Sequence, residues 1–342
     1  MKKSWFDFLS SFGVMMLGIG LLFGASVYFG PAAAGHPRQL PVSAPRALNI
    51  SRVEGGDSVG LELPASKPRV PIKKDSSIFL GSLTAASALV VDDETNTVLF
   101  EKNSNRPRAL ASLTKLMTAL ILNSLPINWQ ATTTVTSDDV DSSSHHLTAG
   151  DVLTLDDLWH AALIGSSNSA VEALVRESGV SNANFVDRMN ARARELRLPS
   201  LAFTEPTGLS GGDVGSAWDA ARLLKEALKI PRIERALMIS EYYIRPAGAV
   251  KARRIWSTDW LLNNWIESEF GPDQIAGKTG FIAESGYNFA ARFTGRAGKS
   301  VRVVILGADT NEARFSAARD LASWALKEYV WPSDPSYSAI VE

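Results

Sequence analysis

The chain has 342 residues, of which 45% are hydrophobic and 21% charged, as in an ordinary globular protein. Its 35 basic and 36 acidic residues leave a net charge of −1, which argues against a dedicated nucleic-acid-binding protein. The absence of cysteine excludes disulfides, thiolate zinc sites and a cysteine nucleophile, and only four histidines disfavour a multi-histidine metal centre. We therefore expect neither a metal nor another cofactor.

Residues 1–35 form the expected export segment. Two lysines at positions 2 and 3 precede an almost wholly apolar or small stretch from Phe8 to Gly30. A spanning helix needs about 20 such residues and a signal-peptide core only about 7–15, so we favour a membrane anchor. The alanines at 32–34 leave a cleaved signal peptide open. Either interpretation predicts that the rest of the chain lies in the periplasm or on the outer face of the cytoplasmic membrane.

The segment 36–77 has the composition of a flexible tether. It shows no helical or strand period, and prolines are scattered among Ser, Gly and charged residues: Pro37, Pro41, Pro45, Pro64, Pro68 and Pro71. Trp331-Pro332 is expected to end the last helix, which leaves 333–342 as a short tail. One globular domain is therefore expected over 78–332.

Within this domain, strands, helices, strands and a closing helix follow one another. Two apolar runs around the turn 92–96 predict a strand–turn–strand unit, and Leu113, Leu116, Met117 and Leu120 give 111–124 a helical period. Further helices are expected near 154–164, 168–178, 181–196, 216–229 and 311–329, and strands near 287–293 and 301–306. This order predicts an α/β fold of the α+β type, with a sheet built from both ends of the chain and helices packed on it.

Ser112-Leu113-Thr114-Lys115 is the first candidate motif. On a helix, the hydroxyl of Ser112 and the amine of Lys115 lie about one turn apart and project the same way. A serine is a weak nucleophile until a base takes its proton, and lysine is such a base when burial or a nearby cation lowers its pKa. Free backbone N–H groups at the helix start can stabilise an oxyanion.

Two more motifs follow in the chain. Ser166-Ser167-Asn168 comes after an apolar run and offers a hydroxyl and an amide on a loop between helices. Lys278-Thr279-Gly280 stands at the start of the late strands and offers a cation, a hydroxyl and a glycine that lets a substrate backbone approach. Each motif alone is unspecific. All three in this order are characteristic of penicillin-binding proteins and class A β-lactamases.

The surrounding residues resemble the serine-type D-Ala-D-Ala carboxypeptidases and D,D-endopeptidases among the low-molecular-mass penicillin-binding proteins. The resemblance covers roughly residues 84–330 and is carried by 111–119, 277–281 and 285–288. Glu205-Pro206-Thr207-Gly208-Leu209-Ser210 has a form typical of the endopeptidase branch. The resemblance implies a β-lactamase/transpeptidase-like fold, with an antiparallel sheet flanked by a helical subdomain. It differs at Ser167, where many members have glycine, but that position is variable.

The resemblance also implies roles for the motif residues. Ser112 attacks the carbonyl between two D-amino acids and becomes acylated, while Lys115 takes its proton and Ser166 relays a proton to the departing amine. Asn168 holds the substrate and Lys115. Water then releases the acyl group.

Substrate binding is implied for the third motif. Lys278 and Thr279, with Gly280, bind the substrate carboxylate, and the backbone N–H groups of Ser112 and Phe281 form the oxyanion hole. The implied partners are peptidoglycan stem peptides, with β-lactams as covalent inhibitors. No nucleic-acid partner is expected.

Two other functions stay open as alternatives. A class A β-lactamase would use a glutamate in a Glu-x-x-Leu-Asn arrangement, but the segment after Glu205 is one residue too long. A non-catalytic cell-wall binding protein would not need three complete motifs. Between the two D,D-peptidase activities, the 205–210 segment and the short chain favour endopeptidase over carboxypeptidase.

Several other polar and aromatic residues are assigned no catalytic role. His145-His146 is expected in a solvated loop, and Asp156 and Asp157 in the first turn of a helix. The basic residues Lys251, Arg253 and Arg254 are expected on a solvated strand face. The remaining aromatic residues of interest, expected in the core or lining a cleft, are Trp256, Trp260 and Trp265.

Overall fold

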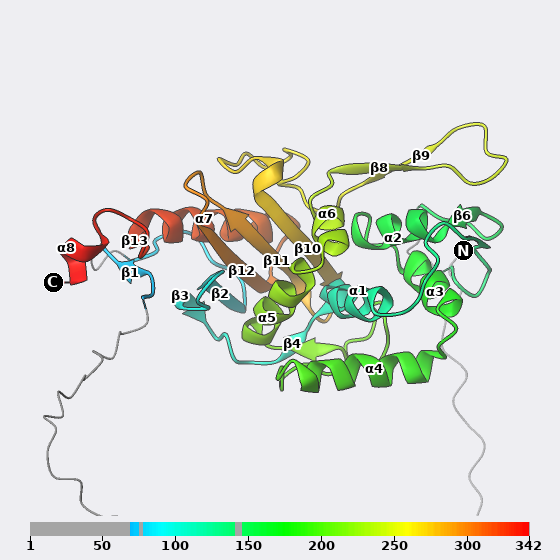
Figure 1. Cartoon of the computed structure of the whole chain (residues 1–342), viewed down its shortest axis with the longest axis horizontal. Helices are drawn as coiled ribbons and strands as arrows, with labels where there is room; N and C mark the ends of the chain where they lie inside the picture. Colours follow the sequence, from blue (N-terminus) through cyan, green and yellow to red (C-terminus); the bar gives the residue numbers. More distant parts are fainter. Residues whose placement is uncertain (1–68, 75–77, 141–145, 342) are drawn as a thin grey trace, which may run out of the picture. The chain divides into compact units, whose positions relative to one another are not determined.

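The computed structural model of the chain describes residues 69–74, 78–140 and 146–341 (Figure 1). The expected export segment, and most of the expected tether, lie outside these residues. Within the described ranges, none of the helices combines the length and apolar character that crossing a membrane requires.

The strands are β1 (Ile72–Lys73), β2 (Ser87–Asp92), β3 (Val98–Lys102), β4 (Arg108–Ala109), β5 (Thr132–Thr134), β6 (Val152–Thr154), β7 (Val214–Gly215), β8 (Glu241–Ile244), β9 (Arg253–Trp256), β10 (Ile275–Ile282), β11 (Gly286–Thr294), β12 (Ser300–Ala308) and β13 (Tyr329–Val330). The helices are η1 (Ala111–Thr114), α1 (Lys115–Asn123), α2 (Leu155–Leu163), α3 (Asn168–Glu177), α4 (Asn182–Glu195), α5 (Ala217–Leu228), α6 (Pro231–Leu237), η2 (Pro272–Gln274), α7 (Asn311–Glu328) and α8 (Tyr337–Val341).

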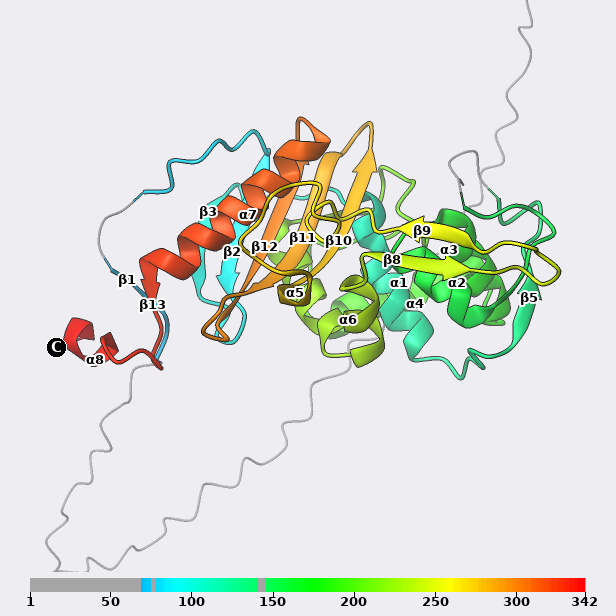
Figure 2. The same cartoon turned by 90° about the horizontal axis from the view of Figure 1, so that it is seen from above.

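The central sheet is antiparallel and combines both ends of the domain, as expected. Its strand order is β10-β11-β12-β2-β3, so strands from the start and the end of the domain lie side by side. Figure 2 shows α7 across one face of this sheet and α5 behind it. The strand β10 is at the edge, next to the helical subdomain of α1–α4. The Lys-Thr-Gly motif therefore lies where sheet and helices meet.

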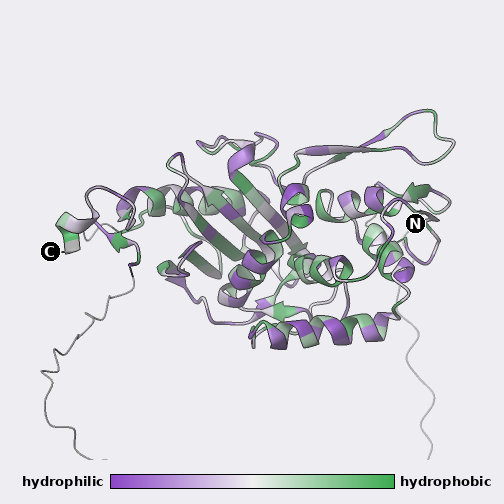
Figure 3. Cartoon of the chain, viewed as in Figure 1, coloured by the Kyte–Doolittle hydropathy of each residue, from purple (hydrophilic) through white to green (hydrophobic). Residues whose placement is uncertain are grey.

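Alternation along the strands gives the sheet two apolar faces. In β2, Leu89 and Val91 belong to the core shared with the helical subdomain, whereas Ala88 and Val90 belong to the core under α7. In Figure 3, α4 is largely hydrophilic, with apolar bands where it faces the domain. Its buried residues Phe185, Met189 and Ala193 recur every fourth position.

The expected elements agree closely with those observed. The strand–turn–strand unit is β2–β3, the helix at 111–124 is η1 followed by α1, and the helices near 154–229 are α2, α3, α4 and α5. Some pairings fall in segments for which no regular structure was expected. Ile72–Lys73 pairs with Tyr329–Val330, inside the expected tether. The tail carries α8, and its Tyr337 hydroxyl donates to the carbonyl of Val70 at 2.9 Å.

Candidate active site

The nucleophile candidate and its base lie in contact. Ser112 belongs to the short helix η1, and Lys115 is the first residue of α1. Lys115 Nζ lies 2.9 Å from Ser112 Oγ. The Lys115 side chain is only 1% exposed, whereas Ser112 is partly exposed. A buried amine beside a reachable hydroxyl is the arrangement that serine activation requires.

Two further oxygens hold the amine of Lys115 in place. Its Nζ donates to Asn168 Oδ1 and to the carbonyl oxygen of Thr207, both at 2.6 Å. Asn168 begins α3, whose N-cap is Ser167: the Ser167 hydroxyl accepts from the N–H of Ala170. The motif at 166–168 thus joins the first motif. Sequence reasoning missed Thr207, because it contributes a backbone carbonyl 92 positions away.

The third motif joins through Ser166. Lys278 Nζ donates to Ser166 Oγ at 2.8 Å and to the carbonyl of Thr279 at 3.0 Å. The hydroxyl of Thr279 lies 2.5 Å from that of Thr258, a residue not anticipated from the sequence. The first hydrogen-bonded set is Ser112, Lys115 and Asn168, and the second is Ser166, Lys278 and Thr279. The turn 166–168 joins the two sets where α1, α3 and β10 meet.

The backbone is strained at two points of the candidate site. Ala111, directly before Ser112, has φ of 50°, and Ser166 has φ of 58°. Left-handed backbone is unfavourable for residues with a Cβ and persists where the surroundings enforce it, often at functional sites. Each of these residues turns the chain beside a hydroxyl of the site.

Two glycines allow the backbone around Ser112 to pack closely. A Cβ on Gly280 would lie 2.7 Å from the carbonyl of Leu110 and 3.1 Å from the Ser112 nitrogen. Gly280 is thus needed for contact with the nucleophile segment, a role not inferred from the sequence. This contact brings the N–H of Ser112 next to the strand residue Phe281, which is the pair expected to form the oxyanion hole.

Gly208 gives a test of this packing. It has φ of +87°, and an added Cβ would lie 2.1 Å from the Ala111 carbonyl oxygen. We expect Gly208→Ala to lower the free energy of unfolding by about 3 kcal/mol or more, because backbone strain and a backbone clash combine. Urea denaturation measures this.

The matched control is Gly179→Ala. Gly179 also has positive φ, +72°, but a Cβ there meets nothing within 4 Å. This variant should lose only about 1 kcal/mol from strain. Equal losses in the two variants would show that the contact with Ala111 is not tight.

Burial and neighbouring charges change the pKa of the Lys278 amine. Burial lowers the pKa of Lys278 well below its ordinary value, and the charges of Lys115 and Arg314 lower it further, against the opposing charge of Asp259. Each of these two cations disfavours the charged form of Lys278, because like charges repel. An anion bound at Lys278 would favour its charged form.

Asp259 is a buried carboxyl that sequence reasoning did not identify. Its Oδ1 accepts from the N–H of Leu261 at 2.9 Å, while Oδ2 has no hydrogen-bond partner. Burial raises the pKa of Asp259 to about 7, against the opposing effects of backbone N–H groups, Arg314 and Lys278. This carboxyl therefore changes charge near neutral pH beside the third motif.

The raised pKa predicts a pH-dependent stability. Between about pH 4, where an unfolded aspartate ionises, and the folded pKa of about 7, the folded state holds a proton that the unfolded state has released. The free energy of unfolding should therefore fall as pH rises, by up to about 1.4 kcal/mol per pH unit from this group, and the slope should end above pH 7.

Asp259→Asn should remove this contribution to the slope, measured by urea denaturation between pH 4 and 8. Exposed Asp309 supplies the control, since Asp309→Asn should leave the slope as in the wild type. A slope unchanged in Asp259→Asn would mean that Asp259 is ionised throughout the range.

Arg314 and Asn288 fix the strand and the nucleophile segment. Arg314 Nη1 donates to the carbonyls of Gly280 and Asn288 at 3.0 and 3.1 Å. Asn288 Nδ2 donates to the carbonyls of Ala109 and Leu110 at 2.9 and 3.1 Å. Asn288 lies in the segment 285–288 that carries the sequence resemblance, whereas Arg314 had been overlooked.

Glu205 is fully engaged by its own loop. Its carboxylate accepts from the N–H and hydroxyl of Thr207, both at 2.6 Å, from the N–H of Gly208 at 2.5 Å and from that of Ser210 at 3.2 Å. These bonds shape the turn that carries the Thr207 carbonyl to Lys115. A structural role for Glu205 argues against the water-activating role that a β-lactamase would need.

The residues that were assigned no catalytic role differ in their exposure and in their partners. Asp156 and Asp157 lie in the first turn of α2, as expected. His146 is partly exposed, and His145 lies outside the described residues. Arg253 and Arg254 pair with Asp151 and Glu241, and Lys251 is exposed. Trp260 is partly buried, but Trp256 and Trp265 are exposed, so these two are not core residues. No group of side chains in the described ranges has the composition of a metal site.

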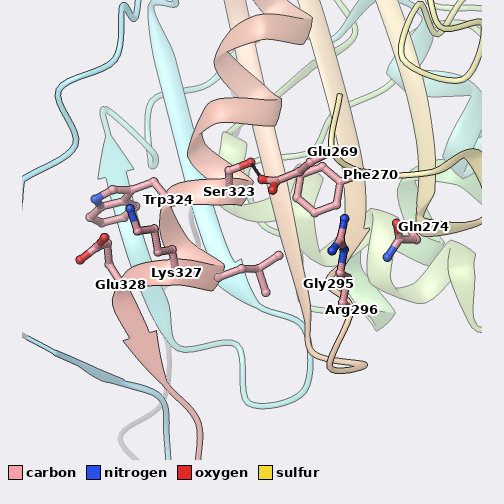
Figure 4. A pocket seen from close by; sticks show the side chains of 10 residues that line it. Glu269, Phe270, Gln274, Gly295, Arg296, Ser323, Trp324, Lys327 and Glu328 are labelled. Carbon is pink, nitrogen blue, oxygen red and sulfur yellow. Dashed lines mark hydrogen bonds between the residues drawn. The ribbon is translucent and has the colours of Figure 1, made fainter. Parts of the chain in front are cut away.

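A cavity of about 490 Å³ lies elsewhere, beside the end of α7 (Figure 4). Its lining includes Ser323, Trp324, Glu269 and Arg296, and the Ser323 hydroxyl donates to Glu269. It contains none of the three motifs, and its serine has no lysine partner among the hydrogen bonds of the described residues. Ser323 and Trp324 in this cavity therefore serve as control positions for substitutions in the candidate site.

Comparison with known proteins agrees with this geometry. Residues 73–310 match the family described as D-alanyl-D-alanine carboxypeptidase. A D-alanyl-D-alanine endopeptidase of Haemophilus influenzae is 33% identical over 207 residues, covering 60% of this chain and 68% of the relative. A D-alanyl-D-alanine carboxypeptidase of Bacillus subtilis is 29% identical over 252 residues, and the match covers 72% of this chain but 63% of that longer protein.

Solved structures share the fold. Penicillin-binding protein D2 of Listeria monocytogenes, in a cefotaxime-bound form, has a TM-score of 0.60 at 28% identity, with 72% of this chain and 98% of that chain covered. The DD-transpeptidase of Streptomyces K15 has a TM-score of 0.65 at 22% identity, with 72% and 98% covered. The β-lactamase/transpeptidase-like fold implied by the sequence is thereby confirmed.

Proposed function

Because this chain belongs to the D-alanyl-D-alanine carboxypeptidase family of serine hydrolases, we propose that it cleaves the bond between two D-amino acids in peptidoglycan peptides. The reaction passes through an acyl-enzyme on Ser112. The observation that carries this proposal is the contact of the buried Lys115 amine with Ser112 Oγ, next to the Ser166–Lys278 pair.

Acylation uses the contact between Lys115 and Ser112 and the contact between Lys278 and Ser166. Neutral Lys115 takes the proton of Ser112 Oγ as that oxygen bonds to the carbonyl carbon, and the developing oxyanion lies at the N–H groups of Ser112 and Phe281. When the tetrahedral centre collapses, the C–N bond breaks and Ser166 passes a proton to the departing amine. The proton that Lys115 accepted from Ser112 is then passed to Ser166, which restores both side chains. Water then adds to the ester and releases the acid.

The carboxylate of the substrate binds at Lys278 and Thr279. An approaching anion opposes the burial and the neighbouring cations that lower the pKa of Lys278 in the free protein, because an opposite charge favours the ammonium form. Since β10 is an edge strand, its free side can align an extended peptide by backbone hydrogen bonds.

We assign the endopeptidase activity ahead of the carboxypeptidase activity. The support is the form of 205–210, whose loop holds Lys115, together with endopeptidase relatives at comparable identity to carboxypeptidase relatives. The deciding experiment incubates the purified protein with cross-linked and with linear muropeptides and reads the products by mass. Cleavage of the cross-linked dimer alone supports an endopeptidase, and loss of D-alanine from the linear peptide alone supports a carboxypeptidase.

β-Lactams are the proposed covalent inhibitors. Slow, stoichiometric labelling by a chromogenic β-lactam supports the D,D-peptidase, since the carboxylate of Glu205 is bound by its own loop and is not placed to activate water. Rapid steady hydrolysis would instead identify a β-lactamase.

The proposed location is the periplasm or the outer face of the cytoplasmic membrane, reached through residues 1–35. The apolar stretch behind two lysines supports it. Fractionation and an immunoblot against a version that starts near His36 test it: a larger, membrane-bound native protein supports an anchor, and an equal size supports cleavage.

A further inference from the structure

The β8–β9 hairpin has an aromatic outer face. Its register pairs Glu241 with Trp256 and Tyr243 with Arg254. Because side chains alternate along a strand, these four lie on one face, opposite buried Ile255. Tyr243 is 53% and Trp256 38% exposed.

Trp265, from the loop after β9, extends this face. Its ring lies 5.8 Å from that of Trp256 and is 54% exposed. Trp260 anchors it, since its ring is 5.9 Å from Trp265 on one side and stacks on Phe315 of the core on the other. We call Tyr243, Arg254, Trp256 and Trp265 the aromatic platform. Neighbouring exposed rings held by the core are typical of a binding surface.

The platform offers ring surfaces without a free charge. The guanidinium of Arg254 is paired with Glu241 and lies 3.6 Å above the Trp256 ring and 5.8 Å from that of Tyr243. An anionic lipid headgroup or a free carboxylate would need an unpaired cation here. One face of Trp256 is covered by this guanidinium, and Trp265 and Tyr243 are the more exposed rings. A neutral ligand with an apolar face and polar edges, such as a sugar ring, matches such aromatic faces.

The position of the platform relative to the site selects one side of the substrate. Trp256 is two residues before Thr258, about 7 Å along an extended chain, and Thr258 is 2.5 Å from Thr279 between hydroxyl oxygens. Under the proposed function, Lys278 and Thr279 hold the carboxylate of the residue that leaves. The platform therefore lies on the leaving-group side of the scissile bond.

We infer that the aromatic platform binds a sugar ring of the glycan strand that leaves when a cross-link is cut. This inference rests on the proposed function and extends it to the leaving strand. A carboxypeptidase releases a single amino acid, which is too small to reach the platform. In a cross-link the leaving amine belongs to a second stem peptide joined to a sugar, and two or three peptide residues span about 7–11 Å.

The test compares three substrates: a linear D-Ala-D-Ala peptide, a sugar-free cross-linked dimer and the same dimer carrying its disaccharides. For Trp256→Ala and Trp265→Ala we expect kcat/KM on the sugar-bearing dimer to fall about tenfold, mainly through KM, with the other two substrates unchanged. Trp324→Ala, in the remote cavity, is the matched control and should change none of the three values. Melting temperatures verify that the variants fold.

Any other result contradicts either the inference about the sugar or the proposed function itself. Equal losses on both dimers would overturn the inference, because the platform would then hold peptide, and no loss on the sugar-bearing dimer would overturn it as well. If the wild type cleaves none of the three and takes no β-lactam label, the proposed function itself fails. A wild type that cleaves the linear peptide yet treats the two dimers alike contradicts only the inference about the sugar.

Discussion

Ser112→Ala should reduce kcat for D,D-peptide cleavage by about 10⁴-fold or more and abolish covalent β-lactam labelling. The variant lacks the oxygen that forms the acyl bond, which lies 2.9 Å from the Lys115 amine. Steady-state kinetics by mass spectrometry of the products, with intact-protein mass after β-lactam incubation, measures both effects.

Ser323→Ala is the matched control for this substitution. Ser323 undergoes the same chemical change but donates to Glu269 in the cavity of Figure 4, so its kcat should equal that of the wild type. Ser112 is partly exposed, and its hydroxyl accepts a single hydrogen bond from Lys115. Its alanine variant should therefore keep the wild-type melting temperature. Persisting labelling of Ser112→Ala at the wild-type rate would refute the assignment of the nucleophile.

Local sequence patterns predicted the elements that position the candidate catalytic residues. The recurrence of apolar residues after Ser112 placed the serine and lysine at a helix start, and apolar runs at both ends of the domain identified the strands of one sheet. The three motifs predicted which side chains contact one another. Their assembly needed the fold, since Lys115 and Asn168 are 53 positions apart and Ser166 and Lys278 are 112 apart.

The residues that were missed act through contacts without a local pattern. Thr207 contributes only a carbonyl, and Thr258 a single hydroxyl. Arg314 did carry a signal, because it precedes Ala318, Leu321 and Ala325 on the buried stripe of α7 at spacings of four, three and four. An arginine on such a stripe must find buried acceptors, which here are the carbonyls of Gly280 and Asn288.

The β8–β9 hairpin was missed for a different reason. Its strands are joined by the eight positions 245–252, so the short turn that marks a hairpin in sequence is absent. Without the pairing, Trp256 is one of three nearby tryptophans that are expected in the core or lining a cleft. Register decides otherwise: Ile255 turns inward and Trp256 outward.

Lys115→Met should lower the rate of acylation by β-lactams at least about 10³-fold, because the methionine has similar length but removes the base. It should also reduce the free energy of unfolding by about 1–3 kcal/mol, since the buried carbonyl of Thr207 and the amide oxygen of Asn168 lose their donor. Stopped-flow labelling measures the first effect and urea denaturation the second.

The control for Lys115→Met is Lys225→Met. Lys225 is a partly buried lysine that donates to the carbonyl of Glu94 at 3.0 Å, away from the three motifs, so its loss should leave the acylation rate unchanged. The rate effect of Lys115→Met cannot come from unfolding if it persists in conditions where the variant is fully folded. A variant that acylates at the wild-type rate would assign the proton of Ser112 to another group, and the Ser166–Lys278 pair would be the next candidate.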